Sequence, residues 1–391
     1  MLNSSFSPWP SFSIEEGDAI RNVLLSNKVN YWTGQECREF EREFSLWVGT
    51  NYAVAVANGT VALDLALKAL HIGTGDEVIV TSRTFLASVS SIVNAGAVPI
   101  FADVDVESQN VTAETIEAVL SSRTRGIICV HLAGWPCDMD PIMALAAKHN
   151  LKVIEDCAQA HGARYKGRAV GSIGHVGAWS FCQDKIMTTG GEGGMVTTND
   201  RSLWSSMWSF KDHGKSWEAV YEREHPPGFR WLHESFGTNW RMLEIQAAIG
   251  RIQLRKMKGW TETRLAHASR IWGCASKLTA LRVPKVPQEY LHAAYKCYVF
   301  LKPEQLKEGW SRDRVLLEIA ERGVPCFTGS CSEVYLEKAF DGTGWRPKKP
   351  MECARTLGET SLMFLVHPTL TDSEIEKTCA VLTSVMELAS L

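Results

Sequence analysis

The feature that most constrains the fold is an alternation of β-rich and helical segments from Tyr52 to about Leu151. Short apolar runs such as YAVAV, EVIVT, AVPIFAD and RGIICVHLA are separated by segments with a helical pattern, such as TVALDLALKAL. One of these helices is predicted to begin with Asp140 as its cap and Pro141 at its first position. Such an alternation is typical of a mostly parallel sheet with helices on both faces, so the sequence predicts an α/β fold.

The alternation stops after Asp156. The next segments, HVGAWSFCQDK and GGEGGMVTTND, predict short strands joined by glycine turns instead of another crossover unit. Irregular backbone of this kind at the end of a parallel sheet indicates a functional site.

With 391 residues the chain is too long for one ordinary core. A long helical segment from Met242 would connect a large domain, residues 1–255 with an N-terminal arm at 1–13, to a small α+β domain, residues 256–391. The small domain contains a strand-like run, AYKCYVFL, and is predicted to have two helices, around Ser311 to Arg322 and Asp372 to Ala389.

Composition excludes several classes of protein. Hydrophobic residues make up 45% of the chain, and its 44 acidic residues nearly balance 41 basic ones, which disfavours nucleic acid or an anionic membrane as a partner. The first residues do not resemble a signal peptide, so we expect a cytoplasmic protein. Eleven scattered cysteines without a C-x-x-C pair suggest neither a disulfide framework nor a metal site.

Two charged residues are candidates for chemistry. Asp156 ends an apolar strand and could hold a positive charge such as a protonated ring nitrogen, although it could equally cap the following segment. Lys185 lies just past a probable strand and before a glycine-rich turn, which suits a lysine that forms a Schiff base in a cleft. Taken alone, a lysine in a polar segment is more often a solvated surface residue.

Other candidates have an ordinary alternative. The segment Asn58-Gly59-Thr60 leads from a strand into a helix whose N-terminus could bind a phosphate, or it is a plain turn with Thr60 as helix cap. Phe85 could lie against an aromatic ring or belong to the core. The GGEGG turn matches neither the P-loop nor the dinucleotide fingerprint, which disfavours ATP and NAD.

Five blocks taken together, NGTVALDLAL, TSRTFLAS, EDCAQAHGA, WSFCQDKIMTTGGEGG and FGTNWRMLEIQAAIG, resemble the motifs of the nucleotide-sugar aminotransferases of the DegT/StrS family. The resemblance covers nearly the whole chain. It implies a fold type I, pyridoxal-phosphate-dependent aminotransferase with a seven-stranded sheet, which acts as a homodimer with shared active sites.

The resemblance also implies a role for each site residue. Lys185 would carry pyridoxal 5′-phosphate as a Schiff base, Asp156 would pair with the pyridine nitrogen, Gln159 would lie near the ring hydroxyl and Phe85 would stack on the ring. The phosphate would be held by Gly59, Thr60 and Ser180. Asn239 would reach in from the partner subunit.

The implied reaction is transamination of a nucleotide-linked 4-keto-6-deoxy sugar. L-glutamate would convert the cofactor to pyridoxamine 5′-phosphate, which would aminate UDP-2-acetamido-2,6-dideoxy-4-keto-hexose for a bacillosamine-like residue of a bacterial surface glycan such as O-antigen lipopolysaccharide. A GDP-perosamine-type 4-aminotransferase and a dTDP-3-keto-sugar aminotransferase remain alternatives. Relatives that remove a hydroxyl have histidine where Lys185 stands, which argues against that branch.

Two alternatives belong to other classes. A binding or regulatory protein that keeps the fold without turnover is disfavoured by the presence of both Lys185 and Asp156. A desulfurase would need an acceptor cysteine, and Cys182 is close to Lys185 but is predicted to face the core.

Several residues are unproven candidates for substrate contacts. Arg83, Arg230 and His233 could contact a sugar or diphosphate oxygen or could form structural ion pairs. His213 and Trp32 lie in loops that resemble the substrate-facing loops of the family.

Overall fold

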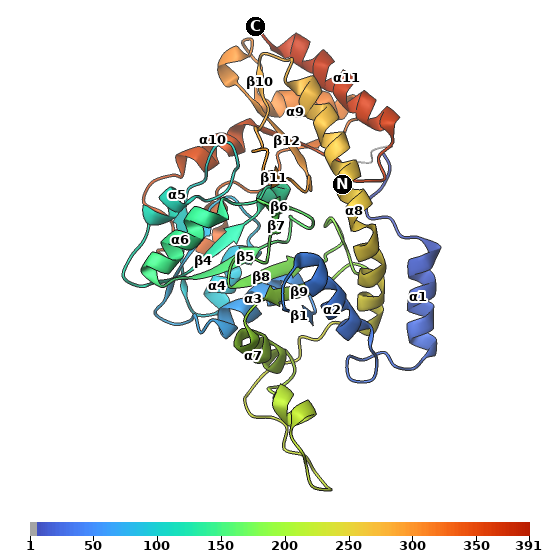
Figure 1. Ribbon diagram of the computed structural model, residues 1–391. Helices are drawn as coiled ribbons and strands as arrows, with labels where there is room; N and C mark the ends of the chain where they lie inside the picture. The colour runs from blue at the N-terminus through green and yellow to red at the C-terminus, as the bar shows by residue number, and fades with distance from the viewer. Residues whose placement is uncertain (1–5) are drawn as a thin grey trace.

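The computed structural model describes residues 6–391, so residues 1–5 of the predicted arm lie outside it (Figure 1). Its main element is a seven-stranded sheet in the order β1-β9-β8-β5-β4-β2-β3. In chain order these strands are β1 (Tyr52–Val56), β2 (Glu77–Thr81), β3 (Val98–Ala102), β4 (Thr124–Val130), β5 (Lys152–Asp156), β8 (Val176–Ser180) and β9 (Gly194–Thr198). The predicted α/β fold with a mostly parallel seven-stranded sheet is confirmed.

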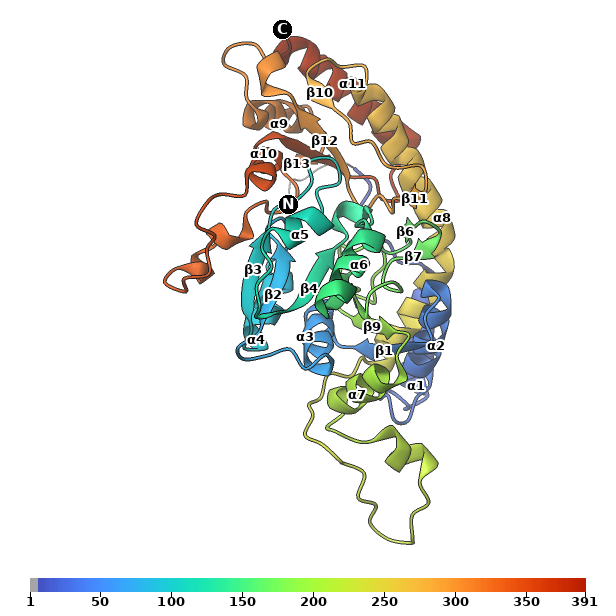
Figure 2. The same cartoon turned by 60° about the vertical axis from the view of Figure 1, so that its left-hand side comes forward.

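Helices pack on both faces of this sheet. Alternate residues of β4 belong to different cores: Ile128 packs with residues of α3 (Gly59–Ala69) and α4 (Ala87–Asn94), whereas Cys129 packs with residues of α6 (Met139–His149). Side chains alternate between the two faces along a strand, so α3 and α4 lie on one face and α6 on the other. Figure 2 shows the same layers edge on, with α5 (Ala113–Glu117) beside α6.

The predicted change after Asp156 is present. Strands β2, β3, β4, β5 and β8 pair in parallel, but β9 pairs antiparallel with both β8 and β1. Lys185 lies in the connection between β8 and β9. This connection replaces a crossover helix, so the backbone there is irregular at the edge where β5 and β8 end.

One helix start was predicted wrongly. α6 begins at Met139 with Asp138 before it, so Pro141 lies at the third helical position and Asp140 is already inside the helix. The Asp138 side chain does not cap the helix, because its Oδ1 accepts the hydroxyl of Tyr165 at 2.6 Å. Asp140 instead forms ion pairs with Lys166 and Arg168 of a neighbouring hairpin.

A second core lies in the C-terminal part of the chain. A four-stranded antiparallel sheet, in the order β10-β12-β14-β13, packs with three helices. The strands are β10 (Leu281–Arg282), β12 (Cys297–Leu301), β13 (Cys326–Phe327) and β14 (Ser361–Phe364), and the helices are α9 (Arg312–Glu321), α11 (Asp372–Ala389) and the end of α8 (Glu244–Ala275). The predicted helices near Ser311 and Asp372 are thus present.

α8 contributes residues to both cores (Figure 1). Leu254 and Met257 pack with the large sheet, and Ala268 and Ile271 pack with the four-stranded sheet. Residue 255, the predicted domain boundary, falls inside this helix, and the division into domains at that point stays a prediction.

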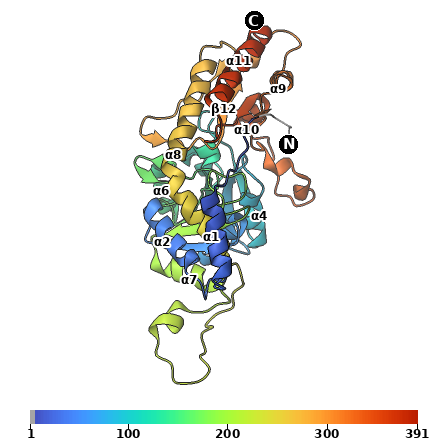
Figure 3. The same cartoon turned by 90° about the vertical axis from the view of Figure 1, so that its right-hand side faces the viewer.

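Three peripheral parts complete the fold. The helices α1 (Ile14–Leu25) and α2 (Glu36–Val48) pack on α8, and α10 (Glu352–Thr360) packs beside β12. A three-stranded sheet joins β11 (Tyr290–Leu291), β6 (Arg164–Tyr165) and β7 (Arg168–Ala169). After α7 (Arg201–Lys211), residues 217–238 form an arm that projects from the body (Figure 3). No helix within residues 6–391 is long and apolar enough to cross a membrane.

Gly59 allows α3 to begin directly against β8. A Cβ atom at this position would lie 2.5 Å from the Cβ of Ser180, the last residue of β8. Real carbon atoms do not approach so closely, so only glycine permits this contact between the helix N-terminus and the strand end.

We expect Gly59→Ala to destabilise the protein by about 1–3 kcal/mol, because α3 or β8 must shift to make room. Urea unfolding followed by circular dichroism measures this change. The matched control is Gly259→Ala in the exposed part of α8, where nothing lies within 4 Å of the added carbon and a gain of about 0.5–1 kcal/mol is expected. Equal stability of the two variants would show that the close contact does not constrain the fold.

Candidate active site

A cavity of about 540 Å³ opens at the carboxyl ends of the parallel strands. Val130 and Asp156 reach it from the last positions of β4 and β5, and Ser180 reaches it from the end of β8. In open α/β sheets this edge is where ligands bind. Of the predicted site residues the cavity is lined by seven: Gly59, Thr60, Phe85, Asp156, Gln159, Ser180 and Lys185.

Asp156 is the buried acid of the cavity. Its carboxylate accepts hydrogen bonds from the hydroxyl of Ser88 at 2.8 Å and from the backbone N–H of Ala158 at 3.1 Å. The second bond shows that Asp156 also holds the turn that follows it, so the two interpretations of this residue do not compete. Burial raises its pKa, although Ser88, the Ala158 N–H and Lys185 act in the opposite direction. A cation bound in the cavity would offset this burial.

Lys185 extends into the same cavity, and its side chain is only 17% exposed. The interpretation of Lys185 as a solvated surface residue is therefore wrong. Its ammonium lies 3.9 Å from Asp184 and 5.4 Å from the centre of the Tyr295 ring. Its backbone carbonyl accepts a hydrogen bond from the indole N–H of Trp9 at 2.9 Å. The lysine is thus held by groups from distant parts of the chain.

The opposite end of the cavity is the N-terminus of α3. Asn58 caps this helix, because its side chain accepts the N–H of Val61 at 3.0 Å, so the prediction of Thr60 as cap is wrong. The first N–H groups of a helix have no partner within it and attract anions. Gly59 and Thr60 present this end of the helix to the cavity next to Ser180.

Phe85 and Gln159 line the cavity between these two ends. Phe85 is 70% exposed, so its alternative assignment to the core is wrong. The Gln159 side chain accepts the N–H of Ala133 at 2.9 Å through its oxygen, which leaves its NH₂ group as a donor. An exposed aromatic face and an amide donor can hold a planar polar ring.

Asn239 is the one predicted cofactor-binding residue that does not line this cavity. It is exposed at the base of the arm, where its backbone pairs with that of Asp212. Arg241, two residues further, donates to the buried Asp212 carboxylate at 2.7 Å, which fixes this part of the backbone.

The candidates for substrate contacts are scattered over the fold. Arg83 is fully buried and donates to Gln109 and Ser361. Within residues 6–391, Arg83, Arg230 and His233 form no ion pair, so the prediction of structural ion pairs is wrong for all three. Trp32 lies under the ammonium of Lys215, and His213 is exposed. Cys182 lines the cavity instead of facing the core.

Four residues around Lys185 and Asp156 were missed by the sequence analysis: Trp9, Ser88, Asp184 and Tyr295. Asp184 could have been found, because it directly precedes Lys185. The other three lie between 68 and 176 positions away from the residue that they contact, and no local pattern links them.

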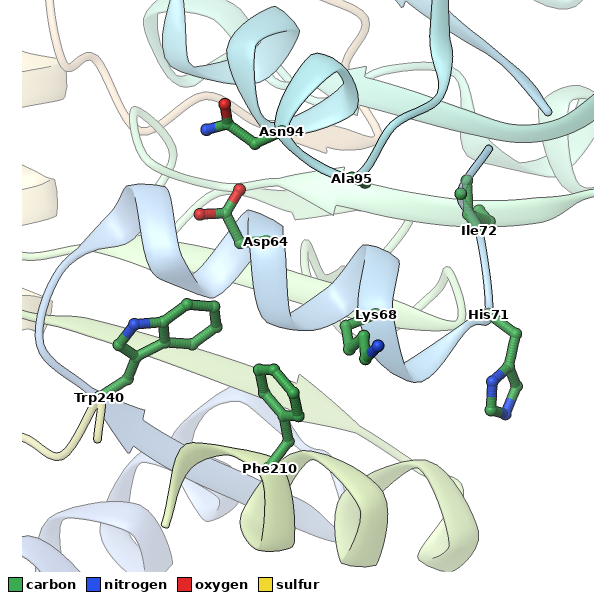
Figure 4. A pocket seen from close by; sticks show the side chains of 9 residues that line it. Asp64, Lys68, His71, Ile72, Asn94, Ala95, Phe210 and Trp240 are labelled. Carbon is green, nitrogen blue, oxygen red and sulfur yellow. The ribbon is translucent and has the colours of Figure 1, made fainter. Parts of the chain in front are cut away.

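A second cavity, of about 520 Å³, lies on the other side of α3. Figure 4 shows the Asp64 carboxylate directed toward Asn94 of α4, with Trp240 and Phe210 across the helix. Asp64 Oδ1 has no hydrogen-bond partner within residues 6–391, and burial raises the pKa of Asp64 from 3.8 to about 6. This cavity offers no lysine next to a buried hydrogen-bonded carboxylate, so the first cavity is the candidate active site.

The chemistry of the first cavity fits pyridoxal 5′-phosphate group by group. A helix N-terminus suits the phosphate, an aromatic side chain suits the ring, a buried carboxylate suits a protonated ring nitrogen, and a lysine amine suits an aldehyde. The residues that provide these groups are, in the same order, Gly59 and Thr60, Phe85, Asp156 and Lys185.

Comparison with known proteins agrees with this fit. Residues 11–383 match the DegT/DnrJ/EryC1/StrS aminotransferase family. The crystal structure of an aminotransferase from Psychrobacter cryohalolentis is 64% identical, covers 98% of this chain and 99% of its own, and superposes with a TM-score of 0.97.

Two curated relatives are named for a sugar linked to a nucleotide. GDP-perosamine synthase of Caulobacter vibrioides is 36% identical over 94% of this chain and 95% of its own length. A UDP-N-acetyl-3-dehydro-alpha-D-glucosamine 3-aminotransferase of Acidithiobacillus ferrooxidans is 35% identical over 92% of this chain and 90% of its own.

The fold and the cavity define a pyridoxal-phosphate-dependent aminotransferase of fold type I. The chain belongs to the DegT/DnrJ/EryC1/StrS aminotransferase family.

The raised pKa of Asp64 predicts an unusual pH dependence of stability. A carboxylate whose pKa is higher in the folded state destabilises the fold increasingly as the pH rises from about 4 to about 6. Asp64→Asn removes this cost, so we expect a gain that is small at pH 4 and reaches about 1–2 kcal/mol at pH 7.5, a value reduced for solvent screening.

Urea unfolding at four or five pH values between 4 and 8 measures the difference between Asp64→Asn and wild type. Asp18→Asn, an exposed acid on α1, is the control and should show no such trend. A gain for Asp64→Asn that is the same at every pH would contradict the raised pKa.

Proposed function

We propose that this chain transfers an amino group from L-glutamate to C4 of UDP-2-acetamido-2,6-dideoxy-4-keto-hexose. The observation that carries the aminotransferase part is Lys185 and Asp156 in one cavity that ends at a helix N-terminus. The relatives support the position of amination and the kind of sugar nucleotide separately. Perosamine is a 4-amino sugar, and the Acidithiobacillus enzyme is named for a UDP-linked N-acetyl sugar.

Each site residue has a proposed part in holding the cofactor. Asp156 keeps a proton on the ring nitrogen, Gln159 donates to the ring hydroxyl, and Phe85 covers one face of the ring. Gly59, Thr60 and Ser180 bind the phosphate. When bound, pyridoxal phosphate supplies an electron sink for bonds at the substrate carbon.

Lys185 has two consecutive roles. Its amine would hold the cofactor in the resting enzyme. Once free, Nζ would take the proton from the α-carbon of L-glutamate in the first half-reaction and deliver a proton to the sugar carbon in the second. Asp184 and Tyr295 position this amine from one side, and Trp9 holds its backbone.

Two alternatives stay within the same chemistry. A GDP-perosamine-type reaction is favoured by the relative from Caulobacter vibrioides. A dTDP-3-keto-sugar reaction is favoured by a dTDP-3-amino-3,4,6-trideoxy-alpha-D-glucose transaminase of Streptomyces venezuelae, which is 33% identical over 91% of this chain. A cytoplasmic location and a part in bacterial surface glycan biosynthesis through a bacillosamine-like sugar stay predictions.

A homodimer with shared sites is part of the proposal. The arm at residues 217–238 exposes four aromatic side chains, Tyr221 by 43%, Phe229 by 77%, Trp231 by 81% and Phe236 fully. Exposed aromatic residues on a projecting segment indicate a protein contact. Asn239, at the base of this arm, does not line the cavity of its own chain, which supports a role in the cavity of a second copy.

The two half-reactions test the proposed substrates. We expect the visible absorption band of the lysine-bound cofactor to fall when L-glutamate is added and to return when the UDP-linked 4-keto sugar follows, because the two steps interconvert the two cofactor forms. The same scan with GDP- and dTDP-linked keto sugars is the comparison. Recovery with a GDP- or dTDP-linked sugar alone would transfer the proposal to that alternative, and Lys185→Ala should show no band.

Complementation tests the shared site. Lys185→Ala and Asn239→Ala are each expected to be inactive or nearly so, but a mixture unfolded and refolded together should recover about a quarter of wild-type activity. A mixed dimer has one cavity with both defects and one with neither, provided that Asn239 serves the partner. If Asn239 acts in its own chain, both cavities stay defective and no activity returns. Light scattering should give twice the chain mass of 43.4 kDa.

A further inference from the structure

A third cavity adjoins the cofactor cavity on the side of the four-stranded sheet. It has a volume of about 580 Å³ and shares five lining residues with the cofactor cavity: Thr84, Phe85, Gln159, Asp184 and Lys185. Its other wall comes from the C-terminal part of the chain, including Tyr295, Lys296 and Tyr298. A molecule that reacts at Lys185 can therefore extend into this space.

Lys296 places a cation on this wall without an anion to balance it. Its Nζ lies 4.7 Å from the centre of the Tyr295 ring, and within residues 6–391 no carboxylate lies within 4 Å of it. Burial lowers the pKa of Lys296 to about 8, against an opposing effect of Asp184. Glu337 also lines the cavity, but it is exposed and forms no ion pair with Lys296.

The surrounding charges do not compensate for Lys296. Asp184 already accepts the hydroxyl of Tyr295 at 2.6 Å and lies 3.9 Å from Lys185. Arg264 is a further buried cation near this group, and burial lowers its pKa to about 9. Lys185 and Lys296 thus share the charge of Asp184, and an anionic group from a substrate in this cavity would stabilise both.

We propose that Lys296 binds a carboxylate of the amino-acid donor. The inference rests on the proposed aminotransferase reaction, in which the donor nitrogen takes the place of Lys185 Nζ. The α-carboxylate carbon of an amino acid is two bonds from its nitrogen. In glutamate, the carbon of the second carboxylate is three bonds from the α-carbon. Lys185 and Lys296 line the same cavity and lie 5.4 Å and 4.7 Å from the centre of the same Tyr295 ring, so a donor bound at Lys185 can direct a carboxylate toward Lys296.

The diphosphate of the sugar nucleotide offers the same anionic oxygens. It is joined to the reacting carbon through the whole sugar ring, so it lies farther from Lys185 than a donor carboxylate does. The two sources can be separated with probes that do not react: glutarate carries the donor carboxylates without an amino group, and UDP carries the diphosphate without a sugar.

The experiment is calorimetric titration of the cofactor-loaded enzyme with each probe. We expect Lys296→Met to weaken glutarate binding roughly tenfold or more, as for the loss of a charged hydrogen bond, and to leave UDP binding within about threefold of wild type. Lys296→Arg, which keeps the charge, should retain most of the glutarate affinity. Lys349→Met, an exposed lysine in the same half of the chain, is the control and should change neither.

Unchanged glutarate binding in Lys296→Met overturns the proposal, and so does a loss that affects UDP alone, which would assign Lys296 to the diphosphate. Should Lys296→Met not fold or not keep the cofactor band, Lys296→Gln is measured in its place with the same criteria. The sugar assay is independent: glutarate binding that depends on Lys296, in an enzyme that aminates no UDP-linked 4-keto sugar, would refute the proposed substrate and leave this site in place.

Discussion

The arrangement of the active site depends on a carboxylate that lies outside it. Glu155 is fully buried beside Asp156 and accepts backbone N–H groups of Gly171, Ile173 and Gly174 at 2.6–2.8 Å and Nε2–H of His131 at 3.0 Å. Burial alone would raise its pKa, but these bonds outweigh burial and hold the pKa below its usual value. They tie β5 to the loop that leads into β8.

This tie fixes the distance between the two ends of the cofactor cavity. Neighbouring residues of a strand point to opposite faces, so Glu155 binds the loop while Asp156 faces the cavity. β8, paired in parallel with β5, then carries Ser180 to the start of α3, and the chain reaches Lys185 five residues later. The helix N-terminus, the acid and the lysine of the cavity are therefore all placed by one pair of strands and one helix start.

The sequence could predict this half of the molecule because its signals are local. Strand and helix periodicity predicted the α/β fold, and the five motif blocks predicted seven residues that line the cavity as well as Asn239, which does not line it. The start of α6 was predicted wrongly because Asp138 bonds a tyrosine 27 positions away instead of its own helix. Trp9, Ser88 and Tyr295 were missed for the same reason, since their contacts depend on how distant segments pack.

The two cavities draw on different amounts of the chain. The cofactor cavity is built from short segments that follow β1, β2, β5 and β8, all of them in the large sheet. The adjoining cavity instead combines Phe85 with residues of the four-stranded sheet and its loops, such as Lys296, Tyr298 and residues 329–331. Substitutions at residues 329–331, which line only the adjoining cavity, change the shape and charge that a substrate meets and leave Asp156 and Lys185 in place. One architecture thus combines a common reaction with different substrates, because the two cavities meet at Lys185 and the adjoining cavity adds a wall from the C-terminal part of the chain.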